Sequence, residues 1–74
     1  MAEGIKIDIA EDGEKMTIKA EFAHWCSIEF PKTKLRIEGY NGIADNMVQQ
    51  LSYDIREMVM QAVTEALMKR EEKN

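Results

Sequence analysis

Two residues near the start of the chain's middle third, His24 and Cys26, carry side chains that could do chemistry. A spacing of two places both on one side of a β-strand. Imidazole and thiolate bind zinc, but a structural zinc site needs four ligands, which two copies of the pair around a twofold axis would supply. A nucleophilic Cys–His pair would need a third, orienting group, and the sequence indicates none. We therefore expect no metal or cofactor, with Cys26 buried and His24 half-buried.

Aromatic and basic side chains form a second candidate site. Trp25 and Tyr40 are expected side by side on the outer face of a sheet, with Arg36 nearby. Trp, Tyr and Arg are the residues most enriched in protein-binding hot spots, so these three are the predicted partner-binding surface. The same aromatics beside the basic segment Lys32–Arg36 could instead stack on single-stranded nucleic acid or a nucleotide. A pair that only stabilises the sheet is the third interpretation.

The element that would position these residues is a long alternation from residue 14 to residue 30. Even positions, from Met16 to Phe30, are mostly apolar, and odd positions are mostly polar. A period of two predicts one long strand that buries its even-numbered face, with a bend or bulge between Phe22 and Cys26.

A first hairpin is predicted between this strand and residues 4–10, which alternate in the same way. The dipeptide Asp12-Gly13 between them indicates a two-residue type I′ turn. Centring the turn there gives a register in which the numbers of two residues paired across the strands add to 25. In this register apolar residues face one another. That register leaves two like charges, Lys6 and Lys19, opposite each other on the outer face.

A second hairpin is predicted between the end of the long strand and a third strand over residues 34–40. In this register Trp25 faces Tyr40 on the outer side of the sheet. On the inner side, Cys26 faces Gly39.

The period changes to 3.6 after the third strand, which predicts one long helix over residues 43–70 and a frayed end at 71–74. Its main apolar stripe is expected to cover the sheet. A second stripe, which we interpret as a self-association face, consists of Tyr53, Met60, Val63 and Leu67.

Composition limits the class of protein. A chain of 74 residues with a single cysteine has no internal disulfide, and so small a domain commonly needs a partner chain to be stable. The net charge of −4 is weak and evenly spread, which makes nucleic acid an unexpected partner. No signal peptide or membrane-spanning stretch is indicated, so we expect the cytoplasm of a bacterial or virus-infected cell.

The sequence thus predicts a single domain over residues 1–74, of class α+β and order β-β-β-α. The predicted function is a non-enzymatic protein-interaction module, homodimeric, that binds an unidentified protein target as a regulator, adaptor or inhibitor of the kind that phages or mobile elements carry. The alternative is a nucleic-acid or nucleotide binder that uses Trp25, Tyr40 and the Lys32–Arg36 segment. A zinc-dependent dimer or small enzyme built on His24 and Cys26 is the third possibility.

Overall fold

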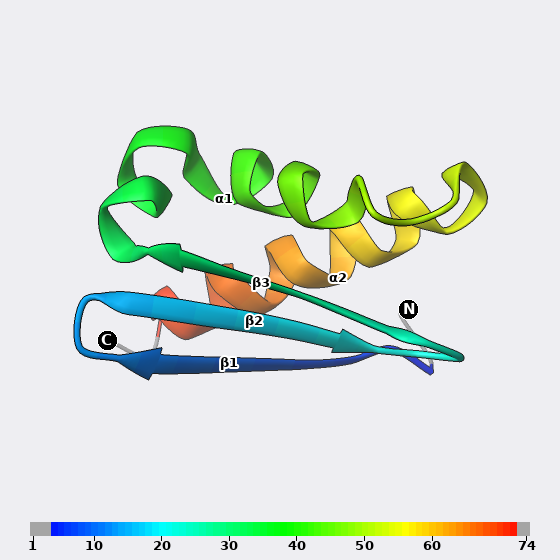
Figure 1. The fold of residues 1–74 in the computed structure, drawn as a ribbon, viewed down its shortest axis with the longest axis horizontal. Helices are drawn as coiled ribbons and strands as arrows, with labels where there is room; N and C mark the ends of the chain where they lie inside the picture. Colours follow the sequence, from blue (N-terminus) through cyan, green and yellow to red (C-terminus); the bar gives the residue numbers. More distant parts are fainter. Residues whose placement is uncertain (1–3, 73–74) are drawn as a thin grey trace.

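The computed structural model describes residues 4–72, which form three strands followed by two helices. The elements are β1 (Lys6–Asp12), β2 (Lys15–Glu21), β3 (Trp25–Pro31), α1 (Lys32–Val48) and α2 (Tyr53–Glu72). The strands form one antiparallel sheet in the order β1-β2-β3, and both helices lie across the same face of it (Figure 1). The predicted α+β class, with a three-stranded antiparallel sheet and a C-terminal helix packed on it, is confirmed.

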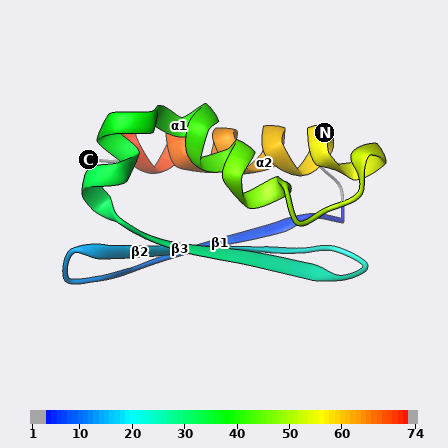
Figure 2. The same ribbon diagram turned by 45° about the horizontal axis from the view of Figure 1, so that its top comes forward.

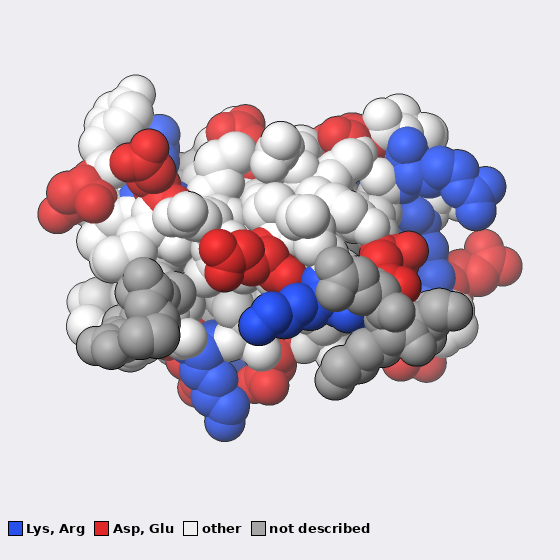
Figure 3. All heavy atoms as spheres, turned by 180° about the vertical axis from the view of Figure 1, so that it is seen from behind, with Lys and Arg blue, Asp and Glu red and all other residues white. Residues whose placement is uncertain are grey.

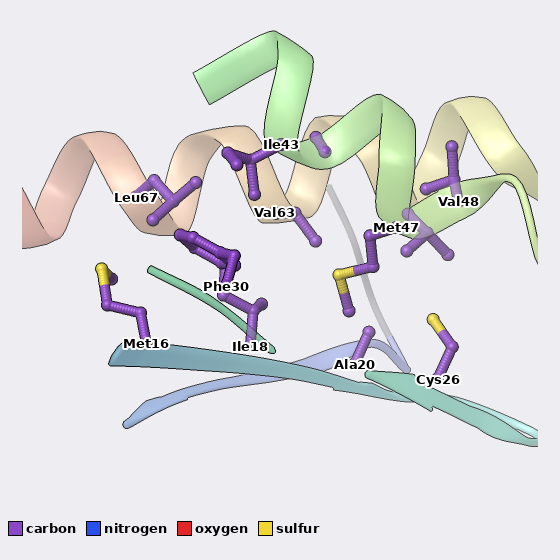
Figure 4. Close-up of a cluster of buried hydrophobic side chains, with 12 residues drawn as sticks. Met16, Ile18, Ala20, Cys26, Phe30, Ile43, Met47, Val48, Val63 and Leu67 are labelled. Atoms are coloured by element: carbon purple, nitrogen blue, oxygen red, sulfur yellow. The ribbon is translucent and has the colours of Figure 1, made fainter. Parts of the chain in front are cut away.

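The core lies between the helices and the even-numbered face of β2 and β3. Met16, Ile18 and Phe30 are at most 2% exposed on that face. Figure 4 shows side chains from both helices pointing toward this row, among them Met47 from α1 and Leu67 from α2. The alternation therefore identified the buried face of these two strands correctly.

The predicted single strand over residues 14–30 is wrong, because the chain turns back in its middle and forms two paired strands. Glu21 pairs with Trp25 across a three-residue loop, in which the Phe22 amide donates to the His24 carbonyl at 2.7 Å. A loop of odd length pairs even-numbered residues with even-numbered ones. The apolar alternation consequently continues through the turn without a break, and its period could not reveal the reversal.

The register of the first hairpin differs from the predicted one by two residues. Partner numbers add to 27, so the same face is buried, but the outer face now pairs Lys6 with Glu21 and Asp8 with Lys19. Opposite charges across strands stabilise a sheet by about 0.2–1 kcal/mol per pair, whereas the predicted Lys6–Lys19 pair would repel. The first of the two loop residues is Gly13, with φ of 64°. Positive φ in that position alone is typical of a type II′ turn, not of the predicted type I′.

The segment predicted as the third strand, residues 34–40, is helical instead. The position beside β2 is occupied by β3, and Pro31 at the end of β3 is also the N-cap residue of α1. Helical geometry leaves Ile37 82% exposed. At Gly39, with φ of 78° and ψ of 175°, α1 kinks through a backbone conformation that is essentially restricted to glycine.

The predicted helix over residues 43–70 is two helices that run in opposite directions. A single helix of that length would extend about 40 Å, and a seven-residue strand about 24 Å, so the sheet could not cover it. The reversal leaves carbonyl groups at the end of α1, and the Arg56 side chain donates to those of Gln49 at 3.1 Å and Leu51 at 2.9 Å. Of the predicted frayed end, residues 71 and 72 belong to α2, and 73–74 lie outside the described residues.

Replacing Gly39 by alanine should lower the free energy of unfolding by about 1–3 kcal/mol, the range for a side chain in this backbone region. Outside its own helical neighbours, no atom lies within 4 Å of the added Cβ, so the loss would come from the backbone. The control is Ile37→Ala, which is exposed and should change stability by less than about 0.5 kcal/mol. Urea unfolding measures both, and equal midpoints would show that the kink does not depend on glycine.

Candidate functional site

His24 and Cys26 are separated in the structure. Cys26 is 3% exposed and lies opposite Ala20 in the core, not opposite Gly39 as predicted. Burial raises the pKa of the Cys26 thiol, which lowers the thiolate fraction at neutral pH and makes this sulfur a poor nucleophile. His24 is exposed in the loop before β3. Within residues 4–72, no three His, Cys, Asp or Glu side chains gather into a set that could hold a metal ion.

Trp25 stands on the outer face of the sheet, as predicted, and is 63% exposed. The Lys19 ammonium lies 5.3 Å from the centroid of its ring, within the range of a cation–π interaction. The same Lys19 lies 3.7 Å from a carboxylate oxygen of Glu21. These contacts hold the indole ring at one end of a face that carries no other layer.

Tyr40 and Arg36 lie on α1, so the predicted cross-strand pair of Trp25 and Tyr40 does not form. Instead, both residues line a pocket of about 470 Å³ between α1 and the end of α2. Two more cations, Lys32 and Arg70, border the same pocket. The structure thus brings Tyr40 and Arg36 together with Lys32 of the predicted basic segment. Trp25 lies apart from them, on the outer face of the sheet.

Acidic side chains compensate much of the positive charge around this pocket. Glu11 of β1 forms ion pairs with Lys32, at 2.6 Å, and with Arg70. Arg70 also pairs with Glu71 at 3.3 Å. Desolvation, and secondarily the charge of Glu71, raise the pKa of the Tyr40 hydroxyl, so this group stays protonated near neutral pH. The network joins β1, α1 and α2, a role for Glu11 and Arg70 that no local pattern indicated.

The predicted self-association stripe does not form a surface. Val63 and Leu67 are fully buried, and Met60 is half-buried against the core. Tyr53 is 85% exposed, and Met58 of the same helix is 47% exposed. Because α2 packs against α1 as well as the sheet, its buried face is rotated relative to the one expected for a helix on a sheet only.

The two edges of the sheet differ, which the sequence did not indicate. At the β3 edge the Ser27 carbonyl accepts a hydrogen bond of 2.9 Å from the Gln50 side chain, and α1 packs against this strand. At the β1 edge, among the described residues, no side chain or loop hydrogen-bonds to the backbone of Ile5, Ile7 or Ile9. All three isoleucines are half-buried. Within residues 4–72, no other segment therefore pairs with these backbone groups of the β1 edge.

Comparisons with known proteins give no relative, since no family model, curated protein or solved structure matches the chain. Of the two helices in residues 4–72, neither combines the length and the apolar character that crossing a membrane requires.

Leu67→Ala should destabilise the monomer fold by about 2–5 kcal/mol, because it leaves a cavity in the core. Tyr53→Ala removes an exposed ring whose contact is with the Arg56 guanidinium, 4.4 Å from its centroid, and should cost less than about 1 kcal/mol. Denaturant unfolding at a single protein concentration separates the two. If Leu67→Ala left stability unchanged, Leu67 would lie on the surface, as the sequence had suggested.

Proposed function

We propose that the chain is a non-enzymatic protein-interaction module that acts as a homodimer and regulates another protein by binding it, as an adaptor or inhibitor. The observation that carries this proposal is the open outer face of the sheet. Both helices lie on the opposite face (Figure 2), and Trp25 stands 63% exposed at one end of the open face. An uncovered sheet face with a large, oriented aromatic side chain is suited to contact with another protein.

The surroundings of Trp25 support a binding role over a purely structural one. An indole ring exposed to this degree adds little burial to its own fold. Its contact with Lys19 orients the ring in advance, which reduces the entropy lost when a partner binds. The next residue along this face of β3 is Ser27, whose short side chain lies opposite Lys19.

A homodimer fits the size of the chain. With 74 residues and a single cysteine, the protein has no disulfide within one copy, and a second copy would add the buried surface that small domains commonly lack. We propose the cytoplasm of a bacterial or virus-infected cell as the compartment in which the protein acts.

Trp25→Ala should weaken capture of the protein target by at least about tenfold, because truncating a hot-spot residue costs about 2 kcal/mol or more. The matched control is Tyr53→Ala, which removes an exposed aromatic ring from α2. Cross-linked capture from the expressing cell should recover the same protein with the native chain and Tyr53→Ala. Equal recovery with Trp25→Ala would contradict the proposal. With a purified target, Trp25 fluorescence reports binding directly, since the chain has one tryptophan.

A second candidate function, binding of a nucleotide or of nucleic acid, is favoured by the pocket that Lys32, Arg36, Tyr40 and Arg70 border. Arg36 forms no ion pair with another described residue, so its guanidinium could donate hydrogen bonds to a phosphate. The charge pattern supports this less well. On the face shown in Figure 3, basic side chains gather at one end, but acidic side chains lie beside them and over the rest of the face. Such a field attracts a polyanion weakly.

The second candidate predicts that ATP or a short oligonucleotide binds with a Kd below about 1 mM at low salt. Arg36→Ala should then weaken binding at least about tenfold, the loss expected for a charge-assisted phosphate contact. Lys34→Ala is the control, because Lys34 pairs with Glu38 at 3.9 Å and does not line the pocket. Isothermal titration calorimetry measures all three, and absence of binding to the native chain would exclude this function.

A further inference from the structure

The direction of the backbone groups at the β1 edge follows from one hydrogen bond at the other side of the sheet. The Lys32 amide donates to the Glu14 carbonyl at 2.8 Å, which continues the register of β2 with β3. Backbone groups alternate in direction along a strand. The backbone amide and carbonyl groups of even-numbered β2 residues therefore hydrogen-bond to β3. Those of odd-numbered β2 residues hydrogen-bond to β1.

The same alternation fixes which residues of β1 face outward. Odd-numbered residues of β2 pair with even-numbered residues of β1, such as Lys19 with Asp8. The amide and carbonyl groups of Ile5, Ile7 and Ile9 consequently point away from the sheet. An uncovered row of this kind is a ready template for another strand.

The isoleucine side chains on this edge are also incompletely covered. Beside them opens a cavity of about 400 Å³, lined by Ile7, Ile9, Ala66, Lys69 and Arg70. The cavity lies between β1 and the last turns of α2. Apolar side chains from an added strand would continue the row of isoleucines under the edge of α2.

We infer that β1 pairs in antiparallel fashion with β1 of a second copy, with Ile7 opposite Ile7 on the twofold axis. This interface rests on the homodimer in the proposed function, and specifies where it forms. In this register Ile5 faces Ile9 of the other copy on the inner side, and Lys6 faces Asp8 on the outer side. The two copies exchange about six backbone hydrogen bonds through their outward-facing residues.

Only registers that differ by an even number of residues keep the apolar side chains on one face. Each such shift of two residues moves the twofold axis by one residue along β1. Charge complementarity favours the register centred on Ile7 over these neighbours. Moving the axis to Asp8 would place two Asp8 carboxylates opposite each other, and moving it to Lys6 would oppose two ammonium groups. Moving it to Ile9 would place Glu11, which is paired with Lys32 and Arg70, opposite Ile7.

The β3 edge is unsuited to the same pairing. The Gln50 side chain already occupies the Ser27 carbonyl, and Pro31 has no amide to donate. A dimer through β1 would form one six-stranded sheet with all helices on one side. The two open faces, each with its own Trp25, would then form one continuous surface on the other side.

The first test removes one outward-facing amide. Ile7→Pro deletes a donor that pairs within the dimer but not within the monomer, and edge strands tolerate proline in such positions. The matched control is Ser27→Pro, which deletes an outward-facing amide at the β3 edge. Circular dichroism checks the fold, and sedimentation equilibrium at protein concentrations up to about 200 µM detects dimers with dissociation constants up to about that value.

The native chain and Ser27→Pro should both be dimeric, and Ile7→Pro should raise the dimer dissociation constant at least about thirtyfold, through loss of the central pair. A monomeric native chain would overturn both this interface and the homodimer, while capture of a target through Trp25 would be unaffected. A dimer of Ile7→Pro with native affinity would overturn the β1 interface only.

The second test reads the register and does not depend on how proline is tolerated. In a Cys26→Ala background, Ile7→Cys should form a disulfide-linked dimer under mild oxidation, because directly opposed Cα atoms lie about 5.5 Å apart. Ile9→Cys should not, since two copies of residue 9 would lie about 13 Å apart in this register. Linkage through residue 9 and not through residue 7 would overturn the proposed register.

Discussion

Met16, Ile18 and Phe30 form a row of apolar side chains that the two helices cover, and the arrangement of the other elements depends on keeping this row out of water. With seven residues per strand, the sheet is too short for one long helix. Two shorter helices side by side, α1 over β3 and α2 over β1 and β2, match its area. The kink at Gly39 and the Arg56 contacts with the turn after α1 are the local devices that permit this layer.

The outer face of the sheet has no such apolar row, and charge determines its pairing. Lys6 with Glu21 and Asp8 with Lys19 are opposite-charge pairs that exist in the observed register and not in the register two residues away. Apolar burial selects which face points inward, but it does not distinguish registers that differ by two. The outer-face charges supply that distinction.

The surfaces that the two helices leave uncovered differ from one another, and the proposed function depends on these differences. One sheet face carries no layer and presents Trp25, held by Lys19. One sheet edge is occupied by Gln50 and ends in Pro31, whereas the β1 edge is unpaired among residues 4–72. The pocket at Arg36 and Tyr40 is another concave surface, and Glu11 and Glu71 offset much of its positive charge. These features favour contact with protein over contact with a polyanion.

The sequence by itself determined the α+β class, the antiparallel pairing of the first hairpin, the buried even-numbered face of residues 14–30 and the outward position of Trp25. Each depends on side-chain alternation, which is a local property. It did not determine the reversal between Glu21 and Trp25, because a three-residue loop preserves the alternation. Nor did it determine whether residues 34–40 form a strand or a helix, since that depends on which segment occupies the place beside β2. The burial of Val63 and Leu67, the meeting of Arg36, Tyr40 and Arg70, and the open edge of β1 were decided by tertiary packing, because each depends on contacts between segments far apart in the chain.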